Sequence, residues 1–331
     1  MIFHGPEFAS LRDPGKPRLF QEDGDVMRLA ICVFLIVCQV LSVRVSHAAE
    51  KETVRLFFLG GQSNMEGHGL NADLPDLLSV AHENIWIFHG NPAEDESPTG
   101  GLGLWAKLTP GHGAGFRSDG TTNNLSHRFG PEVAFAQRIS QLYPGEKIAL
   151  IKYARGGSSI DSRAAREYGS WEMDYLGETG INQFDHFLKT VDSALQANDI
   201  DGNGVMDELI PCGIIWMQGE SDATMTEDIA RSYYANLKRL MDLMRATFRN
   251  DDLAVVIGKI SDSGLENDGK VWIHAELVQS AQEAYVRNHT NAAIVRDTRN
   301  YRYSDPYHYD SQAYMDLGKK FAEAVYRLNK P

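Results

Sequence analysis

Six short apolar runs recur along the chain between residues 54 and 295. They are VRLFFL at 54–59, IWIF at 85–88, KIALIKY at 147–153, CGIIWM at 212–217, LAVVIGKI at 253–260 and AAIV at 292–295. Continuous apolar runs of this length are typical of strands that are buried on both faces of a parallel sheet. We therefore predict a central parallel sheet of five or six strands.

Helical patterns with one apolar face alternate with these runs. Apolar side chains recur every three or four residues between Ile229 and Phe248, and again between Ala313 and Leu328. A third helix is predicted to begin near Pro131, because proline is favoured in the first turn of a helix. Alternating strands and helices predict a single three-layer α/β/α sandwich over residues 49–331.

Residues 1–48 form an N-terminal extension that we expect to contain a signal peptide. An apolar run over residues 29–43 follows Met27, and small residues then precede an expected cleavage site after Ala48. Met27 is the expected start, because acidic residues precede it where a signal should be basic. A retained membrane anchor and lipid attachment at Cys38 are the alternatives. The pattern predicts a secreted or periplasmic protein without stable membrane association after cleavage.

The overall charge limits the classes of partner. The chain carries 32 basic and 45 acidic residues, a net charge of -13 at pH 7. Such an excess of acidic groups repels the phosphate backbone of nucleic acids and anionic membranes. We therefore expect neither as a partner, and neutral small molecules and sugars fit better.

Candidate chemistry directly follows the predicted strands. Ser63 lies after the first strand in a glycine-rich segment, 60–67, where a sharp turn can present its hydroxyl. The segment 155–157 follows the third strand, and Gln218 and Glu220 follow the fourth. Ligands of doubly wound sheets bind outside the carboxyl ends of the strands, so we expect these residues around one cleft.

An acid and an imidazole lie close together near the C-terminus. Asp305 and His308 are three residues apart in the sequence. At this spacing a carboxylate can orient the imidazole ring and stabilise its charged form. A neutral histidine titrates in the range that suits a base for a serine hydroxyl.

Five sequence blocks stand out along the chain: GGQSNMEG, GPE at 130–132, ARGGSSI, QGESD, and DPYH followed by YDSQAYMDLGKKFA. Taken together, they resemble the SGNH-hydrolase superfamily in its sialate O-acetylesterase and acetylxylan esterase branch, carbohydrate esterase family six-like. They stand in the family's order and cover roughly residues 53–328. The resemblance implies a flavodoxin-like sandwich and metal-free deacetylation of an O-acetylated oligo- or polysaccharide.

The resemblance also implies roles for individual residues. Ser63 matches the nucleophile, and His308 and Asp305 match the base and the acid of a triad that works through an acetyl-enzyme intermediate. The implied oxyanion hole consists of the backbone N–H groups of Ser63 and Gly157 and the side-chain amide of Gln218. No cofactor is expected for catalysis.

Other residues near these blocks are candidates for supporting roles. Gly156 is an alternative oxyanion donor, and Arg155 is either a substrate ligand or a solvated or ion-paired surface group. Glu220 either contacts His308 or ties its own loop to backbone N–H groups. The remaining candidates for support or substrate contact are Gln62, Asn64, His68, His89, His112, His127, Trp86, Trp105 and Trp171.

Residues 199–208 resemble the first part of a calcium-binding EF-hand loop. Asp199, Asp201 and Asn203 stand at positions one, three and five, a glycine stands at six and Asp207 at nine. Position twelve, normally a bidentate glutamate, is Ile210. The two interpretations are a structural calcium site on these residues and an acidic, turn-rich surface loop.

Two other functions are compatible with the sequence. The first is a non-catalytic carbohydrate-binding protein on the same fold, against which the intact Ser63, His308 and Asp305 argue. The second is a broad-specificity carboxylesterase, which needs an apolar acyl pocket, whereas the long 90–130 segment is polar. The sequence does not choose between xylan, sialic acid and another acetylated sugar, because specificity lies in loops.

Overall fold

The computed structural model describes residues 51–177, 180–266 and 269–330. The expected start at Met27 and the expected signal peptide lie outside these residues. Within these three ranges, no helix combines the length and the apolar character needed to cross a membrane.

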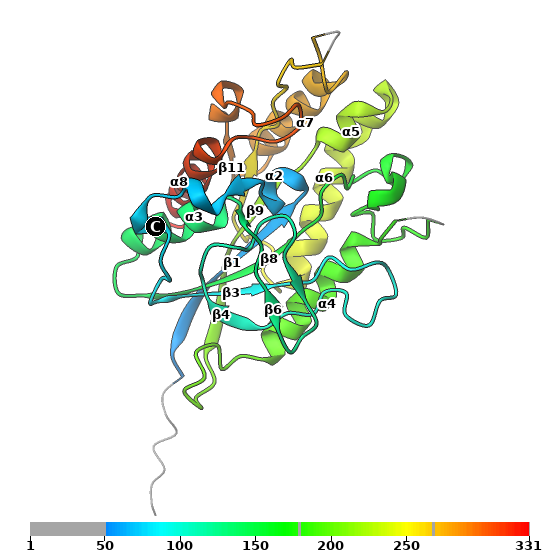
Figure 1. The fold of residues 1–331 in the computed structure, drawn as a ribbon. Helices are drawn as coiled ribbons and strands as arrows, with labels where there is room; N and C mark the ends of the chain where they lie inside the picture. Colours follow the sequence, from blue (N-terminus) through cyan, green and yellow to red (C-terminus); the bar gives the residue numbers. More distant parts are fainter. Residues whose placement is uncertain (1–50, 178–179, 267–268, 331) are drawn as a thin grey trace, which may run out of the picture. The chain divides into compact units, whose positions relative to one another are not determined.

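A seven-stranded sheet forms the centre of the fold, in the order β11-β10-β9-β1-β8-β3-β4 (Figure 1). Its strands are β1 (Thr53–Gly61), β3 (Ile85–His89), β4 (Trp105–Lys107), β8 (Lys147–Ala154), β9 (Glu208–Met217), β10 (Val255–Gly258) and β11 (Ala292–Val295). Neighbouring strands pair in parallel except β4, which runs antiparallel to β3 at the edge. The six predicted parallel strands are confirmed. The sequence pattern missed β4, because this three-residue strand lies in the polar 90–130 segment.

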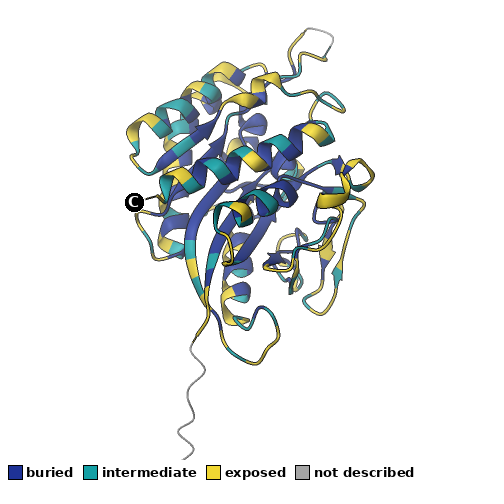
Figure 2. Cartoon of the chain, turned by 90° about the vertical axis from the view of Figure 1, so that its left-hand side faces the viewer, coloured by how far each residue is buried: buried dark blue, intermediate teal, exposed yellow. Residues whose placement is uncertain are grey.

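Helices cover both faces of the sheet, which confirms the three-layer prediction (Figure 1). Helices α3 (Glu132–Leu142) and α8 (Ser311–Leu328) lie on one face, and α4 (Gln183–Gln196), α6 (Glu227–Thr247) and α7 (Ala275–Asn288) lie on the other. Figure 2 shows buried strands between helices whose outer surfaces are exposed. The shorter elements are α2 (Ser63–Glu66), α5 (Glu220–Thr224), β2 (Gly69–Leu70), β5 (Arg117–Ser118), β6 (Asn123–Asn124), β7 (Arg128–Phe129), η1 (Asn71–Asp73), η2 (Asp76–Leu78), η3 (Ser162–Ala164), η4 (Arg166–Tyr168) and η5 (Asp297–Asn300).

The packing of β1 explains why its sequence is continuously apolar. Phe57 packs edge-on against Phe135 of α3, with ring centroids 5.4 Å apart, and the next residue, Phe58, packs against Phe187 of α4 at 4.9 Å. Successive side chains of a strand point to opposite faces. Each position of β1 therefore needs an apolar side chain, whichever helical layer it meets.

The order of the strands reverses at β1, which lies between β8 and β9. The segments that follow β1, β8 and β9 therefore meet at one crevice, the usual ligand site of such a sheet. Gly61 ends β1 with a φ of +144°, and a Cβ atom there would lie 2.0 Å from the Met217 carbonyl oxygen. Only glycine permits this close approach, which brings the start of α2 against the end of β9.

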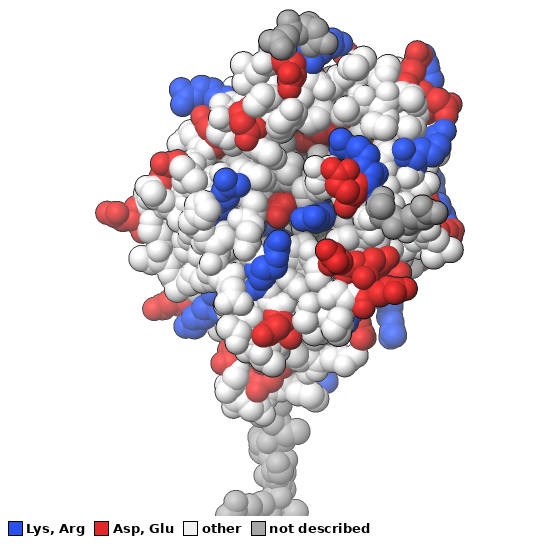
Figure 3. Space-filling view, turned by 45° about the vertical axis from the view of Figure 1, so that its right-hand side comes forward, with Lys and Arg blue, Asp and Glu red and all other residues white. Residues whose placement is uncertain are grey.

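Basic and acidic side chains are interspersed on the face of the molecule drawn in Figure 3. Although the chain has a net negative charge, this face is therefore not uniformly acidic. The expectation that neither nucleic acid nor an anionic membrane is a partner stays a prediction.

Candidate active site

Ser63 begins α2 directly after β1. The turn is closed by the N–H groups of Met65 and Glu66, which both donate to the Gln62 carbonyl at 2.8 Å. Among the described residues, neither the Ser63 hydroxyl nor its N–H has a hydrogen-bond partner. Both groups are therefore available to a ligand.

Asp305 and His308 form a hydrogen-bonded pair before α8. Asp305 Oδ2 lies 2.8 Å from His308 Nδ1, while Oδ1 accepts the N–H groups of Tyr307 and His308 at 2.7 and 2.8 Å. Burial opposes ionisation of Asp305, but the bonds from His308 and Tyr307 outweigh it and lower the pKa of this carboxyl. An ionised carboxylate holds the proton on Nδ1 and leaves Nε2 of the neutral ring as an acceptor.

Ser63 and His308 line the same cavity, of about 870 Å³, which we call the Ser63 cavity. The two residues belong to opposite ends of the described chain, and the crevice brings them together. The lining includes the apolar segment 271–273 and residues of the segment after β8. Among the lining residues are Gln62, His68, Arg155, Gly156, Gly157, Tyr168, Val271, Trp272, Ile273 and Tyr307.

Two glycine N–H groups border the Ser63 cavity, and they differ in availability. The Gly156 N–H donates to Glu66 Oε2 at 2.8 Å, so it is already used. The Gly157 N–H has no acceptor in the part of the chain that the structure describes. Gly157 has a φ of +76°, and a Cβ atom there would lie 2.4 Å from the Tyr168 ring. Gly157, and not Gly156, is thus free to donate to a ligand.

The Gln62 side chain offers a further donor. Its Oε1 accepts the backbone N–H groups of Gly219 at 3.2 Å and Ser221 at 3.3 Å. These two donors establish which end of the amide is the oxygen. Gln62 lines the cavity, and its Nε2 has no acceptor among the described residues. The side-chain N–H groups are therefore available beside Ser63.

Residues 53–327 match the family model of carbohydrate esterases described as sialic acid-specific acetylesterases. The chain belongs to this family. The resemblance inferred from the sequence blocks is confirmed, and so is the prediction of a carbohydrate esterase.

Solved structures share the fold of this esterase at low sequence identity. A protein from Arabidopsis thaliana has a TM-score of 0.57 and 20% identity, and the match covers 84% of this chain and 99% of that one. A carbohydrate acetylesterase from Xanthomonas citri has a TM-score of 0.53 and 16% identity, covering 82% and 56%. The protein NanS has a TM-score of 0.53 and 16% identity, covering 84% and 98%. No curated protein sequence matches significantly.

In the esterase, Gln218 does not fit its predicted role as an oxyanion donor. Its side chain is fully buried and is not part of the Ser63 cavity lining. Nε2 donates to the Ser158 carbonyl at 3.2 Å and to Asp222 Oδ2 at 2.7 Å, and Oε1 accepts from the Tyr233 hydroxyl at 3.0 Å. Both amide hydrogens are therefore used within the protein, and Gln218 ties the end of β9 to the segment after β8.

Asn64 connects α2 to the loop that carries His308. Its Nδ2 donates to the Tyr307 carbonyl at 3.2 Å and to Glu220 Oε1 at 2.9 Å, and its Oδ1 accepts from the Tyr314 hydroxyl at 2.8 Å. Among the described residues, Glu220 has no hydrogen bond to His308, and its Oε1 holds Asn64 instead. Its Oε2 is buried with no hydrogen-bond partner among these residues. The interpretation that Glu220 ties its own loop to backbone N–H groups stays a prediction.

Glu220 is expected to make stability depend on pH. Burial raises its pKa to about 7, whereas an unfolded glutamate has a pKa of about 4.3. The folded chain thus binds the Glu220 proton more tightly than the unfolded chain. The stability that Glu220 contributes is complete below about pH 4 and is lost as the pH rises through 7, with a total loss of about 4 kcal/mol. Urea unfolding between pH 5 and 8 should show a smaller loss in Glu220→Gln than in the wild type.

The exposed Glu83→Gln serves as the control and should follow the wild type. Asp222, whose pKa burial raises to about 6, contributes a loss of the same sign in both proteins. An unchanged pH dependence in Glu220→Gln would assign the effect to another group.

His68 packs face to face on His308, with ring centroids 3.6 Å apart and planes within 9°. Arg128 Nη1 lies 2.8 Å from His68 Nδ1, and a guanidinium can only donate, so Nδ1 is the acceptor. Burial, then His308 and Arg128, lower the pKa of His68 to about 3. Sequence reasoning offered His68 only as a substrate contact, because stacking between distant residues leaves no local pattern. The other three candidate histidines do not line the cavity, and His89 and His112 are buried.

The aromatic residue on the cavity wall differs from the predicted ones. Trp171 is buried and donates to Ser158 Oγ at 3.0 Å, and Trp86 and Trp105 lie on β3 and β4. Trp272 lines the Ser63 cavity instead, within the apolar segment 271–273. The only sequence signal for this segment is a short apolar run in a polar loop.

Arg155 borders the Ser63 cavity and also a neighbouring cavity of about 720 Å³. Its Nε is buried without a hydrogen-bond partner, and no carboxylate among the described residues forms an ion pair with it. The described residues therefore give Arg155 no ion-pair partner, and the choice between a substrate ligand and a solvated surface group stays a prediction. Its guanidinium is available to a ligand.

Proposed function

We propose that this esterase removes O-acetyl groups from carbohydrates by serine catalysis. The observation that carries the proposal is the position of Ser63 on one cavity with His308, which is itself hydrogen-bonded to Asp305. A nucleophile, a base and an orienting acid are the three parts that acyl transfer to serine requires.

The geometry supports the following proton movements. Neutral His308 accepts the Ser63 hydroxyl proton at Nε2 as Oγ attacks the acetyl carbonyl carbon. No described residue hydrogen-bonds Ser63 Oγ, and catalytic contacts of this kind commonly tighten only when the substrate binds. The imidazolium then protonates the sugar oxygen as its bond to the acetyl group breaks. Water, deprotonated by His308, attacks the acetyl-enzyme and releases acetate and free Ser63.

The negative charge on the carbonyl oxygen needs hydrogen-bond donors. Three donors without an acceptor among the described residues belong to this site and can serve that oxygen. They are the backbone N–H groups of Ser63 and Gly157 and the side-chain Nε2 of Gln62. Gln62 thus takes the role that sequence comparison implied for Gln218. Donors that are already in place stabilise the transition state without reorganisation.

Gln62→Glu is expected to lower kcat by about 10²- to 10³-fold with a small change in KM, because a donor beside the oxyanion becomes a repelling carboxylate. The substitution keeps the oxygen that accepts the Gly219 and Ser221 N–H groups. Steady-state acetate release measures the effect. Gln312→Glu, on an exposed residue, should retain wild-type kcat, and an equal kcat in Gln62→Glu would remove Gln62 from the proposed oxyanion hole.

The lining of the Ser63 cavity favours an acidic sugar. Arg155 has no carboxylate partner among the described residues, and a guanidinium binds a carboxylate through two parallel hydrogen bonds. The ring centroids of Trp272 and Tyr307 lie 5.6 Å apart, and the two rings offer aromatic surface to a sugar ring. The proposed substrate is therefore an O-acetylated sugar with a carboxylate, of the sialic acid type, in preference to neutral acetylated xylan.

Acetate release from O-acetylated sialic acid and from acetylated xylan tests this function, with a long-chain ester as the third substrate. A fluorophosphonate probe, mapped by peptide mass spectrometry, should label Ser63. Equal rates on both glycans would contradict the acidic preference. Hydrolysis of the long-chain ester alone would favour a carboxylesterase, and neither acetate nor label would favour a non-catalytic binding protein.

A further inference from the structure

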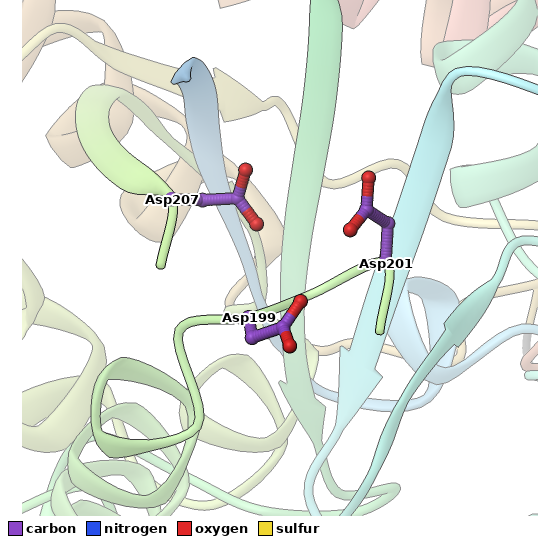
Figure 4. Close-up of side chains that lie close together, drawn as sticks. All are labelled: Asp199, Asp201 and Asp207. Carbon is purple, nitrogen blue, oxygen red and sulfur yellow. The ribbon is translucent and has the colours of Figure 1, made fainter. Parts of the chain in front are cut away.

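Three carboxylates lie together far from the Ser63 cavity, in the connection between α4 and β9. They belong to Asp199, Asp201 and Asp207, and one oxygen of each lies within 4.8 Å of the others. Figure 4 shows the three groups facing a common space. Calcium binds oxygen at 2.3–2.6 Å, so two ligands on opposite sides of one ion are at most about 5 Å apart. The observed separations fit a single ion.

Hydrogen bonds from its own backbone shape the loop around these carboxylates. The Asp199 carboxylate accepts the N–H groups of Asn203 at 3.1 Å and Gly204 at 2.9 Å. Gly204, the glycine at position six, has a φ of +82°. Asn203 Oδ1 accepts the Val205 N–H at 2.7 Å. These bonds turn the acidic side chains toward one another.

A second observation, the burial of the Asp207 carboxylate, points to a cation ligand. The Asp207 side chain has no exposed surface, and only its Oδ2 is bonded, to the Ile200 N–H at 3.0 Å. Asp207 Oδ1 is buried and has no hydrogen-bond partner in the described part of the chain. A buried carboxylate oxygen without a partner is costly, because burial removes its hydration and no donor replaces the lost water.

Lys147 lies beside these carboxylates but does not hydrogen-bond Asp207. Its Nζ lies 2.6 Å from Asp201 and 2.5 Å from Glu52, but 3.9 Å from Asp207 Oδ1. That last separation is too long for a hydrogen bond. Lys147 therefore compensates part of the negative charge of the three carboxylates, but it does not donate a hydrogen bond to Asp207 Oδ1.

We propose that Asp199, Asp201 and Asp207 bind one calcium ion that stabilises the connection between α4 and β9. Asp207 Oδ1 supplies the ligand that no protein group uses. Because Ile210 replaces the bidentate glutamate of position twelve, the expected Kd is about 10⁻⁴ to 10⁻³ M. Lys147 competes with the ion for Asp201.

Calorimetric titration of the chelator-treated full chain with calcium tests the proposal. We expect one ion per chain and an unfolding temperature about 3–6 °C higher in excess calcium. Terbium should give emission sensitised by Trp86, whose ring centroid lies 5.5 Å from Lys147 Nζ. Trp86→Phe should remove this emission and keep the calcium heat.

Matched variants separate calcium binding from a general charge effect. Asp207→Asn should weaken calcium binding by about 10-fold or more, and Lys147→Met should strengthen it by about 10-fold, because a competing positive charge is removed. Asp192→Asn, on an exposed residue of α4, should bind as the wild type does. Absence of heat and of a thermal shift at 5 mM calcium in both the wild type and Lys147→Met would overturn the proposal, as would equal affinities of Asp207→Asn and Asp192→Asn.

Discussion

Ser63→Ala and His308→Ala are each expected to lower kcat for acetate release by about 10⁴- to 10⁶-fold, and the double variant should lose no more than either single one. The nucleophile and its base act as one unit, so removing either one removes the same step. Binding is expected to persist, because Arg155, Trp272 and Tyr307 are unchanged. Initial rates with an O-acetylated glycan and binding measured by calorimetry check both expectations.

Surface variants of the same residue types serve as controls. Ser140→Ala lies on α3 and His289→Ala lies at the end of α7, and both should retain wild-type kcat. Multiplicative losses in the double variant would show that Ser63 and His308 act independently. Activity of Ser63→Ala above about one hundredth of wild type would exclude Ser63 as the nucleophile.

Lys152→Met is expected to destabilise the fold by about 3–5 kcal/mol. The Lys152 and Glu132 side chains are both fully buried, with Nζ 2.7 Å from Glu132 Oε2. Nζ also donates to the carbonyls of Glu66 at 2.9 Å and His112 at 2.8 Å. The substitution leaves a buried carboxylate without its cation and releases the end of α2, so kcat should fall as well.

The double variant Glu132→Gln/Lys152→Met should recover part of the stability, because it leaves no unpaired buried charge, and the Gln oxygen can still accept the Gly130 N–H that Glu132 Oε1 accepts at 2.9 Å. Urea unfolding of the four proteins gives the interaction energy as a double-mutant cycle. The exposed Lys107→Met is the control and should stay within about 0.5 kcal/mol of the wild type. Additive losses in the cycle would show that the two buried charges do not depend on each other.

Sequence reasoning identified the strand ends because the signal there is local. A strand buried on both faces must be continuously apolar, so the first polar or glycine-rich residues after it mark the edge of the sheet. Ser63 and Gly157 were placed in this way, and both border the cavity. The same reasoning failed for Gln218, because a position after a strand does not show where an amide points.

Comparison of Gln62 with Gln218 shows that a local sequence pattern does not report the hydrogen-bond partners of a side chain. Gln62 and Gln218 both follow a strand, and both are amides. Their difference lies in distant partners, since Gly219 holds the oxygen of Gln62 while Asp222 and Ser158 use the nitrogen of Gln218. Only the arrangement of β1, β8 and β9 in space shows which amide has a free N–H.

The sequence by itself determined the layered α/β architecture and the Asp305–His308 pair, because apolar periodicity and a spacing of three residues act within one element. Tertiary structure decided the reversal of strand order at β1, the stacking of His68 on His308 and the burial of Lys152 with Glu132. Each of these contacts joins residues far apart in the chain, and periodicity reports which face of an element is buried but not which group will meet it there.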